Sequence, residues 1–153
     1  MHLIVEADTR TALCRGIQGL AIRAARAVNR ALSRTGRVWD DRYHARVLKS
    51  PRETRAAIVY VLLNWRKHIP AIASPGHVDP CSSGPWFDGW VQWGRTALTP
   101  PTKRPTAPPR TWLASVGWRR GGSIRFEEGP ARPASVGRQR QADWRGYGAC
   151  SLV

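Results

Sequence analysis

A tyrosine and an asparagine four residues apart, Tyr60 and Asn64, have the types and spacing best suited to chemistry in this chain. They lie in the apolar run AAIVYVLLNWRKH. Positions i and i+4 of a helix share one face, so the phenol and the amide are expected to point the same way. His2 opens a short apolar segment, HLIVEA, which could form a strand opposite them. Imidazole and amide ligands around a divalent cation, beside a phenol, form the layout of a metal-assisted tyrosine nucleophile.

The charge of the chain favours an anionic partner. Among 153 residues, 25 Lys+Arg stand against 10 Asp+Glu, a net charge of +15. Most of the cations are arginines, whose forked guanidinium suits phosphate, and this balance favours nucleic acid.

Other features of the composition indicate the cellular compartment of the protein. The cysteines are odd in number and far apart, which predicts reduced thiols in the cytoplasm rather than a disulfide framework. The sequence has no apolar run long enough for a membrane span, and its first residues lack the pattern of a signal peptide. We therefore expect a cytoplasmic protein without a membrane segment.

Four elements are expected to position the chemical groups. Apolar alternation predicts a strand over 2–7, and a helical stripe predicts a helix from about 9 to 34 that is stopped at Gly36. Residues 37–49 read as an extended stretch or hairpin. A second helix over 50–68 has clear start signals, with Ser50 as N-cap, proline at the first helical position and glutamate three residues after the cap.

The composition changes near residue 70. Eleven of the twelve prolines and six of the eight tryptophans lie beyond it. This predicts a partial domain over 1–69 and a largely irregular, mostly disordered extension over 70–153. Its possible ordered islands are 79–90 and 110–118. Four tryptophans there fit either stacking on unpaired bases or a hydrophobic cluster that closes the extension over the domain: Trp86, Trp90, Trp112 and Trp118.

With these segments in hand, the chain resembles the REP-associated tyrosine transposases, which belong to the single-tyrosine HUH transposases. The resemblance covers 2–69 and rests on the order of HLIVEA, NRALSRTG, GRVWDDRYHARVLKSPRE and YVLLNWRKH. It also extends to DPCSSGPWFDGW and RTWLASVGWRR. It implies an α+β, ferredoxin-like domain, often a homodimer, that binds Mg²⁺ or Mn²⁺. A helix tyrosine of the family attacks single-stranded or hairpin DNA and forms a 5′-phosphotyrosine intermediate.

Carried over by position, Tyr60 matches the nucleophile, while His2 and Asn64 match metal ligands. Met1 falls between the family's paired histidines, so the first histidine is expected to precede it. The family's opening strand, first helix and next strand are also missing, and we expect the domain to be incomplete and strand transfer to be impaired. A single imidazole with one amide is expected to bind Mg²⁺ weakly.

Further cations are candidates for DNA contact, because phosphate contacts supply much of the affinity of such proteins. The open alternatives to a strand transferase, which would act at the bacterial nucleoid, are a non-catalytic nucleic-acid-binding protein and a non-functional remnant. The candidate contact residues are Arg23, Arg26, Arg30, Arg42, His44, Arg46, Arg66 and Lys67.

Overall fold

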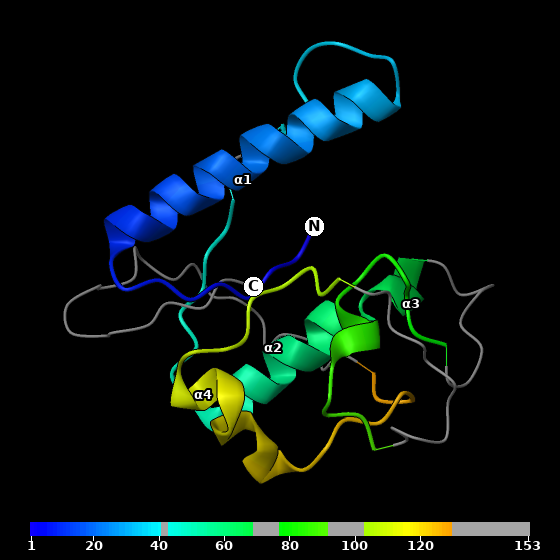
Figure 1. The fold of residues 1–153 in the computed structure, drawn as a ribbon. Coiled ribbons are helices and arrows are strands. Elements are labelled where there is room, and N and C mark those ends of the chain that lie inside the picture. Colours follow the sequence, from blue (N-terminus) through cyan, green and yellow to red (C-terminus); the bar gives the residue numbers. More distant parts are fainter. Residues whose placement is uncertain (41–42, 69–76, 92–102, 130–153) are drawn as a thin grey trace.

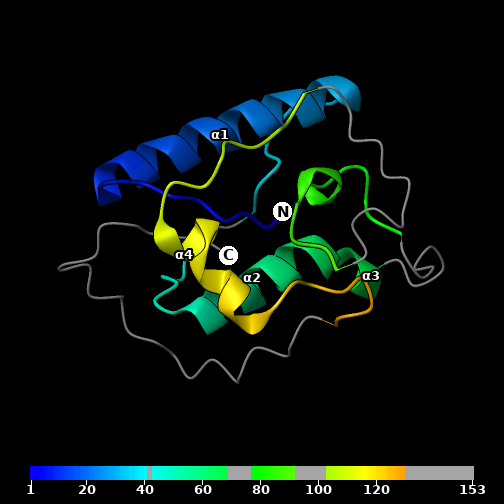
Figure 2. The ribbon, with the colours of Figure 1, turned by 60° about the horizontal axis from the view of Figure 1, so that its bottom comes forward.

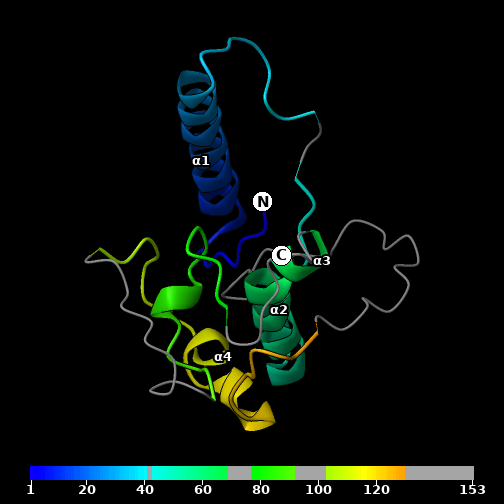
Figure 3. The ribbon, with the colours of Figure 1, turned by 90° about the vertical axis from the view of Figure 1, so that its right-hand side faces the viewer.

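In the part of the chain that is described, helices are the regular elements and irregular segments connect them. The computed structural model describes residues 1–40, 43–68, 77–91 and 103–129. Figures 1 and 3 show the first helix lying apart from the others, with the N-terminal segment running between the two parts. The elements in chain order are α1 (Arg10–Ala31), α2 (Pro51–Leu63), α3 (Trp65–His68), η2 (Gly84–Trp86), α4 (Trp112–Ser115) and η3 (Gly117–Gly121).

Helix α1 begins where the sequence predicts. The Thr9 hydroxyl accepts a hydrogen bond from the N–H of Ala12, as an N-cap does. The helix ends at Ala31, three residues before the expected end, with Leu32 as C-cap. The chain reverses after this point, and Gly36 has a φ of +96°, a conformation that favours glycine.

Helix α2 confirms the second predicted helix. The Ser50 hydroxyl accepts from the N–H of Glu53, and Pro51 occupies the first turn. The Glu53 carboxylate accepts from the backbone N–H of Lys49, one residue before the usual partner in a capping box. Asn64 is the C-cap, and the short helix α3 follows at once.

The prediction of an α+β ferredoxin-like domain is wrong. The described residues contain no strand, and their one β-bridge joins Trp90 to Ile124. The predicted strand at 2–7 is instead inserted between helices: Ile4 packs against the main core, while Val5 and Ala7 pack beside α1. The alternation is real, but helical surfaces on both sides bury it, so the apolar pattern is satisfied without a ladder of hydrogen bonds.

The segment 37–49 also lacks a strand in its described residues. The indole N–H of Trp39 donates to the Ala21 carbonyl oxygen at 3.0 Å, and Val47 packs with the residues under α1. Backbone pairing is replaced here by side chains that attach the segment to α1. Arg42, one of the predicted contact residues, lies outside the described residues.

The main core forms between α2 and the extension, as Figure 2 illustrates for α4 and η3 beside α2. Trp90 and Trp118 are buried in it, which favours the hydrophobic cluster over base stacking for these two indoles. The core draws on both parts of the chain predicted to divide at 69, a boundary that stays a prediction. Its buried members are Ile58, Val59, Leu62, Leu63, Val78, Trp90, Trp118, Ile124 and Phe126.

Two carboxylates attach the extension to the N-terminal part. Glu6 accepts hydrogen bonds from the N–H groups of Arg110 and Thr111, at 2.7 and 2.9 Å, and from the Thr111 hydroxyl. Glu128 accepts two hydrogen bonds from the Arg55 guanidinium, both at 2.9 Å. These contacts join residues more than 70 positions apart. The Glu6 contacts hold the start of α4 against the N-terminal segment, and the Glu128 contacts hold the segment after η3 against α2.

Candidate functional site

The centre of the candidate site is the contact between His2 and Tyr60. The two rings meet edge to face, with centroids 4.8 Å apart and an interplanar angle of 81°. His2 comes from the segment that lies along α2, and Tyr60 is a half-buried residue of α2. The predicted pairing of an N-terminal histidine with the helix tyrosine is therefore present, although no strand carries the histidine.

Asn64 lies one turn after Tyr60, as predicted, but its side chain is largely enclosed. It is 8% exposed, and its Nδ2 lies 3.4 Å from Nε2 of His68. Its backbone N–H donates to the Tyr60 carbonyl oxygen at 2.9 Å, so the α2–α3 junction positions the amide and the phenol together.

The cations of α3 lie beside this centre. The Lys67 ammonium is 5.8 Å from the centre of the Tyr60 ring. The Arg66 guanidinium carbon is 5.7 Å from the centre of the neighbouring Trp65 ring, within the range of a cation–π contact. The phenol is thus flanked by an imidazole on one side and an ammonium on another.

His2 is biased toward its neutral form. Partial burial lowers the pKa of the imidazole, and the positive N-terminus and His68 lower it further. Near neutral pH the ring is therefore available as a hydrogen-bond acceptor or as a base beside Tyr60.

The residues gathered here do not fit Mg²⁺ or Mn²⁺. Such ions prefer oxygen ligands in an open octahedral arrangement, whereas this centre offers imidazoles and one enclosed amide, with the Lys67 ammonium nearby. In the described ranges, no group of three or more His, Cys, Asp or Glu side chains gathers in a way that could hold a metal ion.

The remaining predicted contact residues are spread over the molecule. Three arginines on α1 are exposed, on a helix that lies apart from α2 in Figure 1: Arg23, Arg26 and Arg30. His44 is exposed, and Arg46 is 3.1 Å from Glu53 in an ion pair. Only Arg66 and Lys67 lie in the short helix next to Tyr60, so the predicted set does not form one patch.

The sequence-based prediction did not include His68 in the site. Its spacing of four from Asn64 was the available signal that the two side chains lie close together. The prediction also missed the structural function of Glu6, which holds α4. Arg55 and Glu128 were missed too, since a contact between residues 73 positions apart leaves no local pattern.

No family model, no curated protein and no solved structure matches this chain. None of the helices in the described ranges is both long enough and apolar enough to cross a membrane.

Proposed function

We propose that this chain is a relative of the REP-associated tyrosine transposases that binds single-stranded or hairpin DNA at the Tyr60 centre, with impaired strand cleavage. The single observation that supports this function most is the contact between His2 and Tyr60. The resemblance assigns these two residues to one site, although they lie 58 positions apart in the chain.

The groups around Tyr60 suit a single strand. The phenol offers a stacking surface for an unpaired base, and the ammonium of Lys67 offers a contact for the neighbouring phosphate. The net charge of +15 would draw a polyanion to the protein from all sides.

The covalent step would be slow. In it, the Tyr60 hydroxyl oxygen attacks phosphorus, the bond to the 3′ oxygen breaks, and a 5′-phosphotyrosine forms with a free 3′ hydroxyl. The phenolic proton passes to the neutral imidazole of His2, and the departing 3′ oxygen takes its proton from solvent water. A free phenol has a pKa of about 10, and among the described residues one ammonium, that of Lys67, stands beside the phenol to offset the charge of the transition state.

In keeping with the resemblance, we place the protein in the cytoplasm of a bacterium, at the nucleoid, and we propose a homodimer. Sedimentation of the free chain and of its DNA complex measures the stoichiometry directly.

The test is the affinity for a fluorescent DNA hairpin with a single-stranded flank, measured by anisotropy over a range of salt. We expect salt-dependent binding that falls about fivefold or more in Lys67→Gln and in Tyr60→Ala. The matched control for the phenol is Tyr43→Ala, an exposed tyrosine in the segment before α2. Affinity that is unchanged by Lys67→Gln and Tyr60→Ala would overturn the proposal.

Cleavage is read from the same reaction with a label at the 3′ end of the DNA, followed by denaturing gel electrophoresis. We expect only a trace of covalent adduct, absent in Tyr60→Phe and retained in Tyr43→Phe. Efficient adduct formation would overturn the impairment, while an adduct that persists in Tyr60→Phe would overturn the assignment of the nucleophile.

A further inference from the structure

A hollow lies at the other end of α2, between its first turns and η3. It has a volume of about 520 Å³ and is open to solvent on one side. We call it the α2–η3 pocket. Its polar and glycine lining consists of Arg52, Arg55, Arg120, Gly121, Glu128 and Gly129.

The cations of the pocket outnumber its anions. Three arginines line it against one carboxylate, that of Glu128, which gives the lining a net charge of +2. Glu128 is occupied by both terminal nitrogens of Arg55 and by the N–H of Arg125. Partial burial raises the pKa of this carboxyl, but these hydrogen bonds outweigh burial and hold the pKa below its ordinary value. The Glu128 carboxylate is therefore engaged by groups of the protein itself.

The donors of Arg55 are likewise engaged by groups of the protein itself. Besides Glu128, its guanidinium donates to the carbonyl oxygens of Gly122 and Ser123, at 3.1 and 3.0 Å. A Cβ added to Gly121 would lie 2.6 Å from the Cδ of Arg55, so the loop passes as close as glycine allows. Arg55 therefore builds the wall of the pocket, and the charges left for a ligand are those of Arg52 and Arg120.

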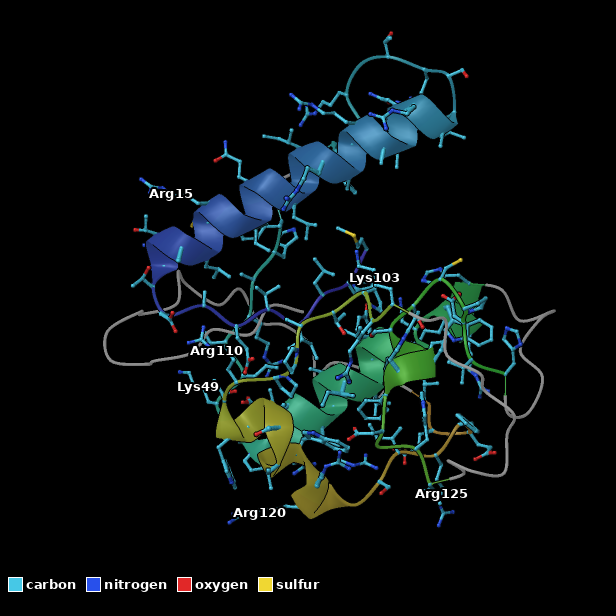
Figure 4. The ribbon with its side chains drawn as sticks, viewed as in Figure 1. Arg15, Lys49, Lys103, Arg110, Arg120 and Arg125 are labelled. Carbon is cyan, nitrogen blue, oxygen red and sulfur yellow. The ribbon has the colours of Figure 1, made fainter. Side chains whose placement is uncertain are left out.

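Arg120 is held in place by an aromatic ring. Its guanidinium carbon lies 4.9 Å from the centre of the Trp112 ring. Stacking uses the flat face of a guanidinium and leaves the N–H groups in its plane free to donate, which is the arrangement that binds phosphate oxygens in pairs. Figure 4 shows Arg120 projecting from η3 at the outer edge of the molecule.

The pocket and Tyr60 share one side of α2. Arg52 and Ala56 line the pocket, and Tyr60 follows at the same spacing of four, so these residues form one stripe along the helix. Eight residues of helix separate Arg52 from Tyr60 by about 12 Å. A single strand that runs along this stripe would touch both places.

We propose that the α2–η3 pocket binds a phosphate group of a single DNA strand through Arg52 and Arg120, as a second contact beyond the Tyr60 centre. This inference extends the proposed function, on which it rests. The recognising chemistry is that of a phosphate ester, which a free nucleotide also carries, and the experiment separates the two sources.

The experiment measures the anisotropy of fluorescent oligothymidylate with the full chain at a series of salt concentrations. In Arg52→Gln/Arg120→Gln we expect about a tenfold loss of affinity and a salt slope reduced by about 1.4, since each contact with a single-strand phosphate contributes about 0.7. The control Arg15→Gln/Lys103→Gln removes the same charge from positions that Figure 4 places away from η3. We expect it to lose less than threefold.

Equal losses of affinity in the two double variants would overturn the proposal that the pocket binds a phosphate. Thermal melting by circular dichroism checks the fold. Both pocket arginines are exposed, so the melting temperature should not change.

Inorganic phosphate and thymidine monophosphate form the second arm, in which the amide NMR signals of Gly121 and Gly129 are followed. We expect shifts that require millimolar ligand, and we expect added oligothymidylate to displace the ligand so that the signals move to the positions of the oligothymidylate complex. Tight binding of thymidine monophosphate that oligothymidylate does not compete with would overturn the proposal of a DNA strand and would favour a small ligand in the pocket.

The pocket and the Tyr60 centre can fail separately. Loss of affinity in the pocket variant with none in Lys67→Gln and Tyr60→Ala would support the pocket and reject the proposed function at Tyr60. The reverse pattern would reject the pocket and leave the Tyr60 centre standing.

Discussion

The two long helices of this protein are secured in opposite ways. Helix α1 has 22 residues but buries only Leu13 and Ile17, whereas α2 has 13 residues and buries six. The difference lies in their partners. The extension of the chain encloses α2, while α1 rests on a few side chains of the segments at 1–8, 37–40 and 43–49. Helix length thus says little about how firmly a helix is held, because tertiary burial supplies most of its stability.

The sharpest test of this comparison is one leucine from each helix. We expect Leu63→Ala to lower the free energy of unfolding by about 3–4 kcal/mol, since Leu63, the last residue of α2, is fully buried against the extension. We expect about 2 kcal/mol or less for Leu13→Ala, because its shallow cluster can close over the gap. Urea denaturation followed by tryptophan fluorescence and by circular dichroism measures both. Equal losses would show that α1 is as firmly packed as α2.

The second test breaks the attachment of the extension to α2. Arg55→Gln removes the charged pair with Glu128, whose side chains are 20% and 26% exposed. We expect a loss of about 1–3 kcal/mol, since a partly buried carboxylate loses its partner. The matched control is Arg46→Gln, which breaks a more exposed pair with Glu53 and should cost about 0–1 kcal/mol. A smaller loss at position 55 than at 46 would contradict the idea that the extension secures α2.

A third test uses acid. The folded pKa of Glu128 is below its ordinary value of about 4.3, so the unfolded chain binds more protons as the pH falls through that range. The contribution of Glu128 to stability is therefore complete above about pH 4.3 and is lost as the pH falls through the lowered pKa. We expect the stability of Glu128→Gln to depend less on pH below 5 than that of the parent chain. Parallel curves for the two proteins would show that the carboxyl is not the group responsible.

The smallest effect should come from the N-caps. Thr9→Ala and Ser50→Ala each remove a side-chain acceptor at a helix start, for a cost of about 1 kcal/mol. We expect the change at Ser50 to lower global stability. The change at Thr9 should appear mainly as faster amide hydrogen exchange in the first turn of α1. A global loss from Thr9→Ala would mean that α1 unfolds together with α2.

Local signals predicted the helices well, because a cap such as Ser50 and a spaced apolar stripe act within a few residues. The pairing of His2 with Tyr60 was also predicted, through the resemblance. The predicted sheet is absent from the described residues, since alternation in 2–7 records only that both faces are covered and not whether strands or helices cover them. The hydrogen bonds between Glu6 and Thr111 could not be predicted, because no local sequence pattern near one residue indicates a contact with the other.

The location of the core partners has a consequence during synthesis. Leu63 leaves the ribosome 63 residues before Phe126, which packs in the same cluster. At about 5–20 residues per second, that interval lasts roughly 3–13 seconds. Throughout it, the apolar side of α2 lacks the part of its covering that comes from Trp118, Ile124 and Phe126, and it is open to chaperones and to other nascent chains. Each new copy of this protein therefore passes through a period of exposure that a helix buried by its immediate neighbours would avoid.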